Sequence, residues 1–275
     1  MEEPKLTLLN ITMPVTSLEP SLLTSGDAHY GVRGVSLQEW ISEAKKEFSK
    51  CPDNFLILTG DNIENCIAGS PGHGYDIELK DPQLQNAHVA EALKEISKEL
   101  YGSSWKKYDG SVNGCRCVGL IGNHEYRSRK MSGIWISEQQ YGPGKIIDAK
   151  VNALIKLKLV HKKLKLERTY TIFAAHRPYQ SDASTLESIL RSCRKKKGDI
   201  SADVYCYGHY HRRVAIPDSA FDINGQYRKV MYIVNPSPMC NVEYADWAGY
   251  SPLSVGWFQR LVLPLDPGKH PYTIV

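Results

Sequence analysis

The chain has 275 residues, a near-average hydrophobic fraction of 42% and a formal net charge of +4 at pH 7. Its length allows one large α/β domain or two small ones, and its composition is that of an ordinary soluble globular protein with a buried core. The mild net charge does not by itself indicate a nucleic-acid partner, so only local basic clusters can bear on that question.

The cysteines and the N-terminus bear on the cellular compartment. Seven cysteines is an odd number, paired CxxC motifs are absent, and Cys115 and Cys117 are too closely spaced for an ordinary disulfide or zinc knuckle. We interpret them as reduced thiols of a cytoplasmic protein. The first five residues are acidic rather than basic, and no apolar segment approaches membrane-spanning length, so we expect neither secretion nor contact with a membrane.

The first candidate site residues follow a short apolar stretch. Residues 22–26 predict a strand that ends in a loop, and this loop carries Asp27 and His29. Residues two apart in an extended segment point to the same side, so this carboxylate and imidazole could share one metal ion. An isolated pair of this kind more often serves turn chemistry.

A helix and a buried strand come next. Residues 36–50 place apolar side chains at helical spacing behind a serine cap, and residues 55–59 form a continuous apolar run typical of a central parallel strand. That run ends at Asp61. The strand-helix-strand order predicts a right-handed crossover, which would make Asp27, His29 and Asp61 neighbours at one sheet edge.

A second helix is expected from about 82 to 100, and a strand at 118–121 that ends at Gly122-Asn123-His124-Glu125. On a loop at a strand end, an amide carbonyl and an imidazole can serve a metal ion and a reacting phosphate together. The alternative is a turn with an ordinary surface histidine. The basic residues that follow, at 126–130, are either a solvated charged run or a place where Arg127 or Arg129 contacts a phosphate.

Two more apolar runs end at histidines. Residues 146–168 are compatible with helix or strand, but residues 164–173 alternate as a strand and lead to His176. After a helix at 186–193, a strand at 202–207 ends at His209 and His211, and two imidazoles two apart on a glycine turn are a strong metal signature. Residues 230–236 and 258–263 are expected to be strands of a second sheet.

The candidate residues thus occur in the order D-x-H, G-D, G-N-H-E, H and G-H-x-H, mostly at the ends of predicted strands. This ordered set resembles the calcineurin-like metallophosphoesterase superfamily over about residues 22–236. Residues 243–252, together with 122–127, are similar to stand-alone bacterial and phage members. The resemblance implies a four-layer α/β/β/α sandwich of two mixed sheets, and we expect a single domain over residues 1–275.

The resemblance also implies a site with two divalent metal ions. Asp27, His29 and His211 would bind one ion, Asn123, His176 and His209 the other, and Asp61 would bridge both. A mixed nitrogen and oxygen set without thiolate suits manganese first, with iron, zinc or nickel as alternatives. His124 would stabilise charge on the phosphate or protonate the leaving oxygen, and Glu125 would orient His124.

The implied activity is phosphoester hydrolysis by a hydroxide that bridges the metals. Basic residues near the site favour a phosphodiesterase or nuclease acting on nucleic acid or nucleotides. One alternative is a phosphomonoesterase, including a Ser/Thr protein phosphatase, with Arg127 as the clamp for a terminal phosphate. Another is a non-catalytic binding scaffold, which is disfavoured because no expected ligand is missing. A dimer is an open alternative that the sequence does not require.

Overall fold

A computed structural model describes residues 6–65, 77–133, 135–177, 186–197, 200–221, 227–239 and 256–273. The stretch 243–252 that is similar to bacterial and phage proteins lies outside these residues. None of the described helices is long and apolar enough to cross a membrane.

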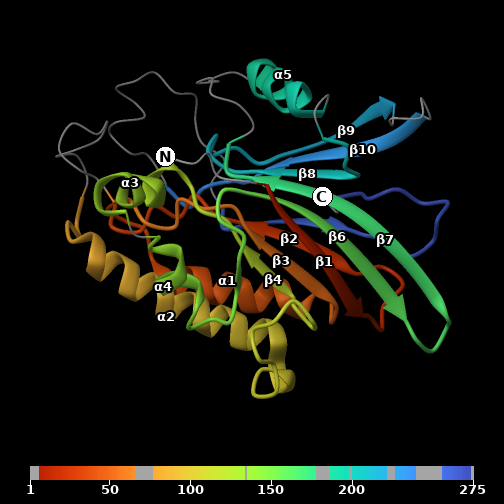
Figure 1. Ribbon diagram of the computed structural model, residues 1–275, viewed down its shortest axis with the longest axis horizontal. Coiled ribbons are helices and arrows are strands. Elements are labelled where there is room, and N and C mark those ends of the chain that lie inside the picture. The colour runs from red at the N-terminus through yellow and green to blue at the C-terminus, as the bar shows by residue number, and fades with distance from the viewer. Residues whose placement is uncertain are drawn as a thin grey trace.

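The strands form two mixed sheets that pack face to face (Figure 1). The six-stranded sheet has the order β1 (Thr7–Pro14), β6 (Asn152–His161), β7 (Leu166–Ala175), β8 (Val204–Tyr207), β10 (Tyr227–Val234), β9 (Val214–Phe221). The five-stranded sheet has the order β11 (Phe258–Val262), β2 (Ser21–Ser25), β3 (Asn54–Leu58), β4 (Cys117–Gly119), β5 (Ile147–Asp148). The neighbouring pairs β6 and β7, β9 and β10, and β2 and β11 are antiparallel, and the others are parallel.

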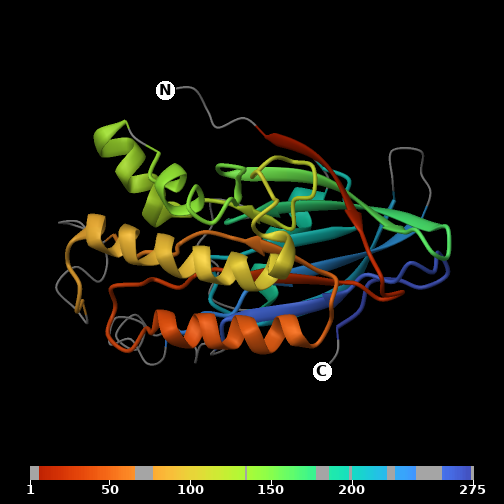
Figure 2. The same cartoon turned by 90° about the horizontal axis from the view of Figure 1, so that it is seen from below.

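Helices cover the outer faces of the two sheets. Helices α1 (Leu37–Ser49), α2 (Pro82–Tyr101) and α4 (Ser137–Tyr141) lie beside the five-stranded sheet, while α5 (Leu186–Lys197) lies outside the six-stranded sheet (Figure 1). Viewed from below, α1 and α2 run side by side (Figure 2). A short 3-10 turn, Gly102–Ser104, follows α2. The predicted four-layer α/β/β/α arrangement is confirmed.

The helix starts follow ordinary capping chemistry. The Ser36 side chain accepts a hydrogen bond from the backbone N–H of Glu39, and α1 buries the apolar face formed by Trp40, Ala44 and Phe48. The Asp81 carboxylate caps α2, whose first residue is a proline that needs no N–H partner. Both helices therefore begin close to the residues that the sequence indicates.

Strands β2 and β3 lie side by side and parallel, with Leu23 opposite Leu56, and every residue of both strands is buried. Because the chain crosses from one to the other through α1, both strands end at the same edge of the sheet. The predicted crossover is confirmed, and it brings the loops after Ser25 and Leu58 together.

Two expectations about strands change. The ambiguous region 146–168 contains strands and no helix: β5, all of β6 and the first residues of β7, joined by short turns. The prediction that residues 230–236 and 258–263 share a sheet is wrong, because β10 pairs with β8 while β11 pairs antiparallel with β2. Both are short apolar strands, and such a pattern carries no information about the neighbouring strand, which contacts distant in the chain decide.

Candidate active site

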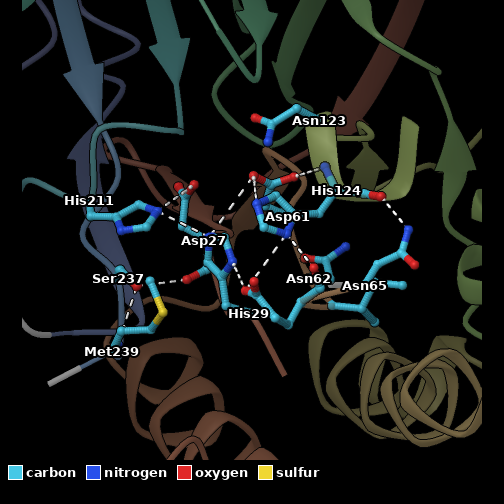
Figure 3. A network of polar contacts seen from close by, with 12 residues as sticks. Asp27, His29, Asp61, Asn62, Asn65, Asn123, His124, His211, Ser237 and Met239 are labelled. Carbon is cyan, nitrogen blue, oxygen red and sulfur yellow. Dashed lines mark hydrogen bonds and ion pairs between the residues drawn. The ribbon is translucent and has the colours of Figure 1, made fainter. Parts of the chain in front are cut away.

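Polar side chains meet where the strands of both sheets end. The loops after β2 and β3 and the N-terminus of α3 (Asn123–Ser132) come from one sheet, and the loops after β7 and β8 come from the other. Asp27, His29 and Asp61 lie at the centre, with His211 on one side and His124 on the other (Figure 3). All five are candidate site residues that were predicted from the sequence.

The loop after β2 is not the extended segment that the sequence indicated. Asp27 and His29 have positive φ angles of 51° and 48°. Their backbone N–H groups donate to the carbonyl oxygens of Gly60 (2.8 Å) and Asp61 (2.9 Å), so the neighbouring loop holds this strained backbone in place. His209 and His211 also have positive φ angles, of 72° and 52°. Backbone strain of this kind in non-glycine residues is common at functional sites.

Gly122 permits the close approach of the Asp61 loop to α3. A Cβ atom at this position would lie 2.0 Å from Asp61 Oδ1, so no larger residue fits without movement of the carboxylate. Gly122 is also the residue that precedes α3, so Asn123 and His124 belong to the first turn of a helix rather than to a loop. The backbone N–H groups of a first helical turn have no partner within the helix. One of them, the N–H of His124, donates to Asp61 Oδ1 (2.8 Å).

Glu125 organises the backbone of these loops and does not contact His124 as the resemblance implied. Its buried carboxylate accepts hydrogen bonds from the N–H groups of Asp61 (2.9 Å), Asn62 (2.6 Å) and Gly122 (3.0 Å). Burial, together with the nearby charge of Asp61, raises the pKa of Glu125 to about 7. Glu125 is thus a structural support for the loop that carries Asp61.

We expect Glu125→Ala to lower the free energy of unfolding by at least about 3 kcal/mol, because it leaves several buried N–H groups unpaired at roughly 1–3 kcal/mol each. Urea denaturation of metal-free protein measures this. The control is Glu99→Ala, which removes an exposed carboxylate that pairs with Lys45 and should change stability by less than about 0.5 kcal/mol. Equal effects of the two substitutions would contradict the structural role.

The first ligand group comprises Asp27, His29 and His211. The Nε2 atoms of the two histidines lie 3.0 Å apart, and His211 Nε2 is 3.6 Å from Asp27 Oδ1. Asp27 is fully buried, and its Oδ2 atom has no hydrogen-bond partner. A buried carboxylate oxygen without a partner beside two imidazole nitrogens is what a cation site requires.

The second ligand group comprises Asp61, His176 and His209, with Asn123 beside it. His176 Nε2 lies 3.0 Å from Asp61 Oδ2 and 3.1 Å from Asn123 Oδ1. Asp61 Oδ2 is also 3.9 Å from His29 Nε2, so this carboxylate lies between the two groups. The donor atoms of the second group therefore lie close to those of the first, with Asp61 near both.

The two most buried histidines have their outer nitrogens fixed. His176 Nδ1 donates to the carbonyl oxygen of Thr59 (2.9 Å), and His29 Nδ1 donates to Glu64 Oε2 (2.7 Å). Each bond holds a proton on Nδ1, so Nε2 is the nitrogen that could bind a metal ion. Because nearby carboxylates raise the pKa of both rings to about 9, a metal ion would have to displace the proton on Nε2. Histidines that bind metal ions usually have such a second partner.

Glu64 is a site residue that the sequence analysis missed. Besides its bond to His29, its carboxylate lies 3.6 Å from His124 Nδ1, and its carbonyl oxygen contacts the same nitrogen. Burial alone would lower the pKa of His29, but Glu64, Asp61 and Asp27 raise it to about 9. The signal available in the sequence was an acidic residue three positions after Asp61, which is too common to single out.

We expect Glu64→Gln to weaken metal binding by roughly 10- to 100-fold, because the amide orients His29 less firmly and removes a negative charge. Isothermal titration of the metal-free protein with Mn²⁺ measures this affinity. Glu78→Gln is the matched control, since Glu78 is exposed and forms an ion pair with the exposed Arg33. An unchanged affinity in Glu64→Gln would show that His29 needs no such support.

Arg127 lies against the ring of His124. Its Nη1 and Nη2 atoms are 3.3 and 3.4 Å from the two ring nitrogens, and Nη1 also donates to the carbonyl oxygen of Asn65 (3.4 Å). Burial, with the charges of His29 and Arg127 adding to it, lowers the pKa of His124 despite Asp61 and Glu64. The Arg127 guanidinium therefore lies next to the His124 ring.

Arg129 lies elsewhere. It donates to the carbonyl oxygen of Gly133 at the end of α3, and its guanidinium lies 5.2 Å from the centre of the Trp135 ring. Residues 127 and 129 are about 200° apart around a helix, so both cannot face the same site.

The ionisable groups of the cluster are strongly perturbed. Burial raises the pKa of Asp27 to about 7, and burial together with His176 lowers the pKa of His209 to about 3. Burial and the charge of His29 hold the pKa of His211 well below its usual range. His209 and His211 are thus neutral at pH 7 and can offer lone pairs. Such concentrated perturbation is typical of functional sites.

Comparison with known proteins concerns the fold. No protein-family model matches the chain, and no curated protein matches it in sequence. Among solved structures, a conserved uncharacterized protein from Streptococcus pneumoniae TIGR4, a predicted phosphoesterase, has 11% identity and a TM-score of 0.36, covering 93% of this chain and 98% of that chain. Vacuolar Protein Sorting 29 from Cryptosporidium parvum has 12% identity and a TM-score of 0.39, covering 94% and 100%.

The NAD nucleotidase of Haemophilus influenzae has 10% identity and a TM-score of 0.43, and the match covers 94% of this chain but 49% of that one. At these identities and TM-scores the likeness has no bearing on activity. The two packed mixed sheets with helices outside are themselves the four-layer α/β fold expected of the calcineurin-like metallophosphoesterases. The chain has this fold, with a cluster of histidine and aspartate residues that could bind metal.

Proposed function

We propose that this protein is a dinuclear metal-dependent phosphoester hydrolase. The observation that carries the proposal is the place of the Asp61 carboxylate between two groups of nitrogen and oxygen donors. We assign Asp27, His29 and His211 to one ion, Asn123, His176 and His209 to the other, and Asp61 to both. The unpartnered Asp27 Oδ2 and the fixed Nδ1 protons of His29 and His176 support this assignment.

The donor set suits two divalent transition-metal ions. The donors are imidazole nitrogens with carboxylate and amide oxygens, and they include no thiolate. Such a set favours manganese first, with iron, zinc or nickel as alternatives. When bound, such ions would polarise the phosphoryl oxygens and supply a water molecule of lowered pKa as the nucleophile. The residues of this chain would hold the ions, exclude other solvent and position the phosphate.

His124 acts on the reacting phosphate in this proposal. Its Nδ1 faces the Glu64 carbonyl oxygen, so the proton at Nδ1 is held there, and Nε2 faces Asp61 Oδ2 at 3.9 Å. In the imidazolium form Nε2 also carries a proton, which it would donate to a phosphoryl or leaving-group oxygen. Arg127 beside the ring adds a fixed positive charge for the same phosphate.

A phosphodiesterase or nuclease that acts on nucleic acid or nucleotides is the reaction class we favour. Support comes from α3, where Lys130 lies 5.4 Å from the Tyr126 ring centre and Tyr126 lies 5.9 Å from Trp135. These residues form a cationic and aromatic group on and next to α3, the helix that also carries His124 and Arg127. Aromatic faces and basic side chains are the combination that binds single-stranded nucleic acid.

Two other readings remain as outcomes of the test. A phosphomonoesterase, including a protein phosphatase, would use the guanidinium of Arg127 to bind a doubly charged terminal phosphate. A non-catalytic scaffold would use the same fold to bind a partner.

The described cysteines, among them Cys115 and Cys117, are free and buried, which supports the proposed cytoplasmic location.

Hydrolysis of bis(p-nitrophenyl) phosphate and of p-nitrophenyl phosphate tests the proposal, with Mn²⁺ added to metal-stripped protein. We expect Mn²⁺-dependent turnover with preference for the diester. Preference for the monoester would instead support the phosphatase reading. Failure to bind Mn²⁺, Fe²⁺, Zn²⁺ or Ni²⁺ would contradict the dinuclear site. Metal binding without turnover of either compound, or of nucleic acid, would favour the scaffold.

A further inference from the structure

The edges of the two sheets differ in how they are protected. A sheet edge presents unpaired N–H and C=O groups, and proteins usually block such edges with short strands, proline, charges or a covering segment. In the described part of the chain, β5 ends one sheet and is only two residues long. At the other end of that sheet, Tyr272 pairs with Val262 of β11, and Arg213 donates to the carbonyl oxygen of Phe258.

Strand β9 is protected by its sequence. Pro217 faces Met231 of β10, and the Met231 N–H donates to Asp203 on the far side, next to β8. The pair 217 and 231 is therefore not hydrogen-bonded, and position 217 faces the outer edge, where proline supplies no donor. Asp218 adds a charge at the next position.

Strand β1 has no such protection from the part of the chain that the structure describes. Among the described residues it pairs with β6 on one side and with no strand on the other, and it runs along the margin of the molecule (Figure 2). Residues 7–13 contain no charged side chain. Leu8 is 67% exposed, the largest exposed fraction among the apolar side chains given for the described residues. This long neutral edge is the kind that pairs with another strand.

The direction of the backbone groups of β1 follows from one bond. The Val15 N–H donates to Val160 of β6 (3.0 Å), and backbone groups alternate along a strand, so odd-numbered residues face β6. Leu8, Asn10 and Thr12 therefore present their N–H and C=O groups outward. The next outward position is Pro14, which has no N–H and ends the edge.

We propose that two copies of this chain associate through antiparallel pairing of their β1 strands, with Asn10 at the twofold axis. In this register Leu8 lies opposite Thr12 of the partner subunit, so all three outward donors of each copy meet a carbonyl oxygen. Pro14 lies beyond these three positions, so the pairing does not need the N–H group that proline lacks. The pairing occupies the same edge of both copies and is therefore closed, so it gives a dimer rather than a filament.

The second copy is favoured over other strands because the edge is self-complementary. Positions 8 and 12 are equally far from Asn10, so each outward N–H group meets a carbonyl oxygen of the second copy, and a neutral edge meets its own copy without charge repulsion. None of the residues assigned to the metal ions lies on β1, so this inference stands or falls independently of the proposed function.

Cross-linking tests the register. In a hydrogen-bonded antiparallel pair the opposed Cα atoms are about 5.5 Å apart, within the range of roughly 4.4–6.8 Å for a disulfide. We expect Asn10→Cys to give a disulfide-linked dimer under mild oxidation. Thr12→Cys is the matched control, because two copies of position 12 would lie about 14 Å apart at roughly 3.4 Å per residue. Linkage of Thr12→Cys or of the unsubstituted protein to the same extent would overturn the proposed register.

Sedimentation velocity over a range of concentrations tests the association itself. We expect a dimer whose dissociation constant rises at least about tenfold in Leu8→Lys, since a lysine on an edge opposes pairing. Leu166→Lys on β7, at a leucine with 41% exposure, is the control and should leave the dimer intact. Circular dichroism verifies that each variant is folded. A protein that is monomeric at every concentration, or equal dimers in both variants, would overturn the proposal.

Discussion

His124→Ala is expected to lower kcat for bis(p-nitrophenyl) phosphate by about 10²- to 10⁴-fold while leaving both metal ions bound. The range is that of a positioned acid or hydrogen-bond donor. Metal binding should persist because the alanine keeps the backbone N–H that donates to Asp61 Oδ1. Steady-state kinetics and elemental analysis of the metal content measure the two effects.

This experiment also decides between two roles for the ring. His29, Asp61 and His124 themselves form a group with metal-ligand spacing, so the geometry allows His124 to be a ligand. Loss of a metal ion in His124→Ala would show that it is one, and full activity would exclude both roles. His88→Ala is the control, since His88 is exposed on α2 and its ring forms a hydrogen bond with the Tyr30 hydroxyl group.

Asp61→Asn should reduce bound metal from two ions to one or none and lower kcat by roughly 10³-fold or more. The expected decrease in kcat follows because a metal ion stabilises the charge of the transition state by several kcal/mol. About 1.4 kcal/mol corresponds to a tenfold change in rate. Asparagine preserves the shape and an acceptor for the His124 N–H, so the change is mainly one of charge. Titration calorimetry and kinetics of the same preparation measure it.

Asp109→Asn is the matched control for this substitution, because Asp109 is exposed and bonds locally to Ser111. Two bound ions and normal turnover in Asp61→Asn would contradict the position of this carboxylate between the ligand groups. Urea denaturation should accompany the test, so that loss of metal is not confused with unfolding.

Local chemistry allowed much of the fold to be predicted. The serine before α1, the buried run of β3 and the alternation of β7 identify elements whose stability depends on neighbours in sequence. The parallel pairing of β2 and β3 followed from the intervening helix, since crossovers have one hand. The partners of β10 and β11 did not follow, because register and neighbour depend on side chains from distant strands.

The sequence by itself determined which chemical groups the site would contain. Asp27, Asp61 and the four histidines at strand ends are of ligand type, and strand ends of an α/β sheet are where such groups collect. Their arrangement depends on the tertiary structure. Asp27 Oδ1 and His211 Nε2, for example, are 3.6 Å apart although they are separated by most of the chain.

Only the tertiary structure decided the roles of the supporting residues. It placed Glu64 on His29, turned Glu125 to the backbone of the Asp61 loop, and separated Arg127 from Arg129. The physical reason is that a residue type reports what a side chain can bind. The partner it binds depends on which loops the packed sheets bring within hydrogen-bonding distance.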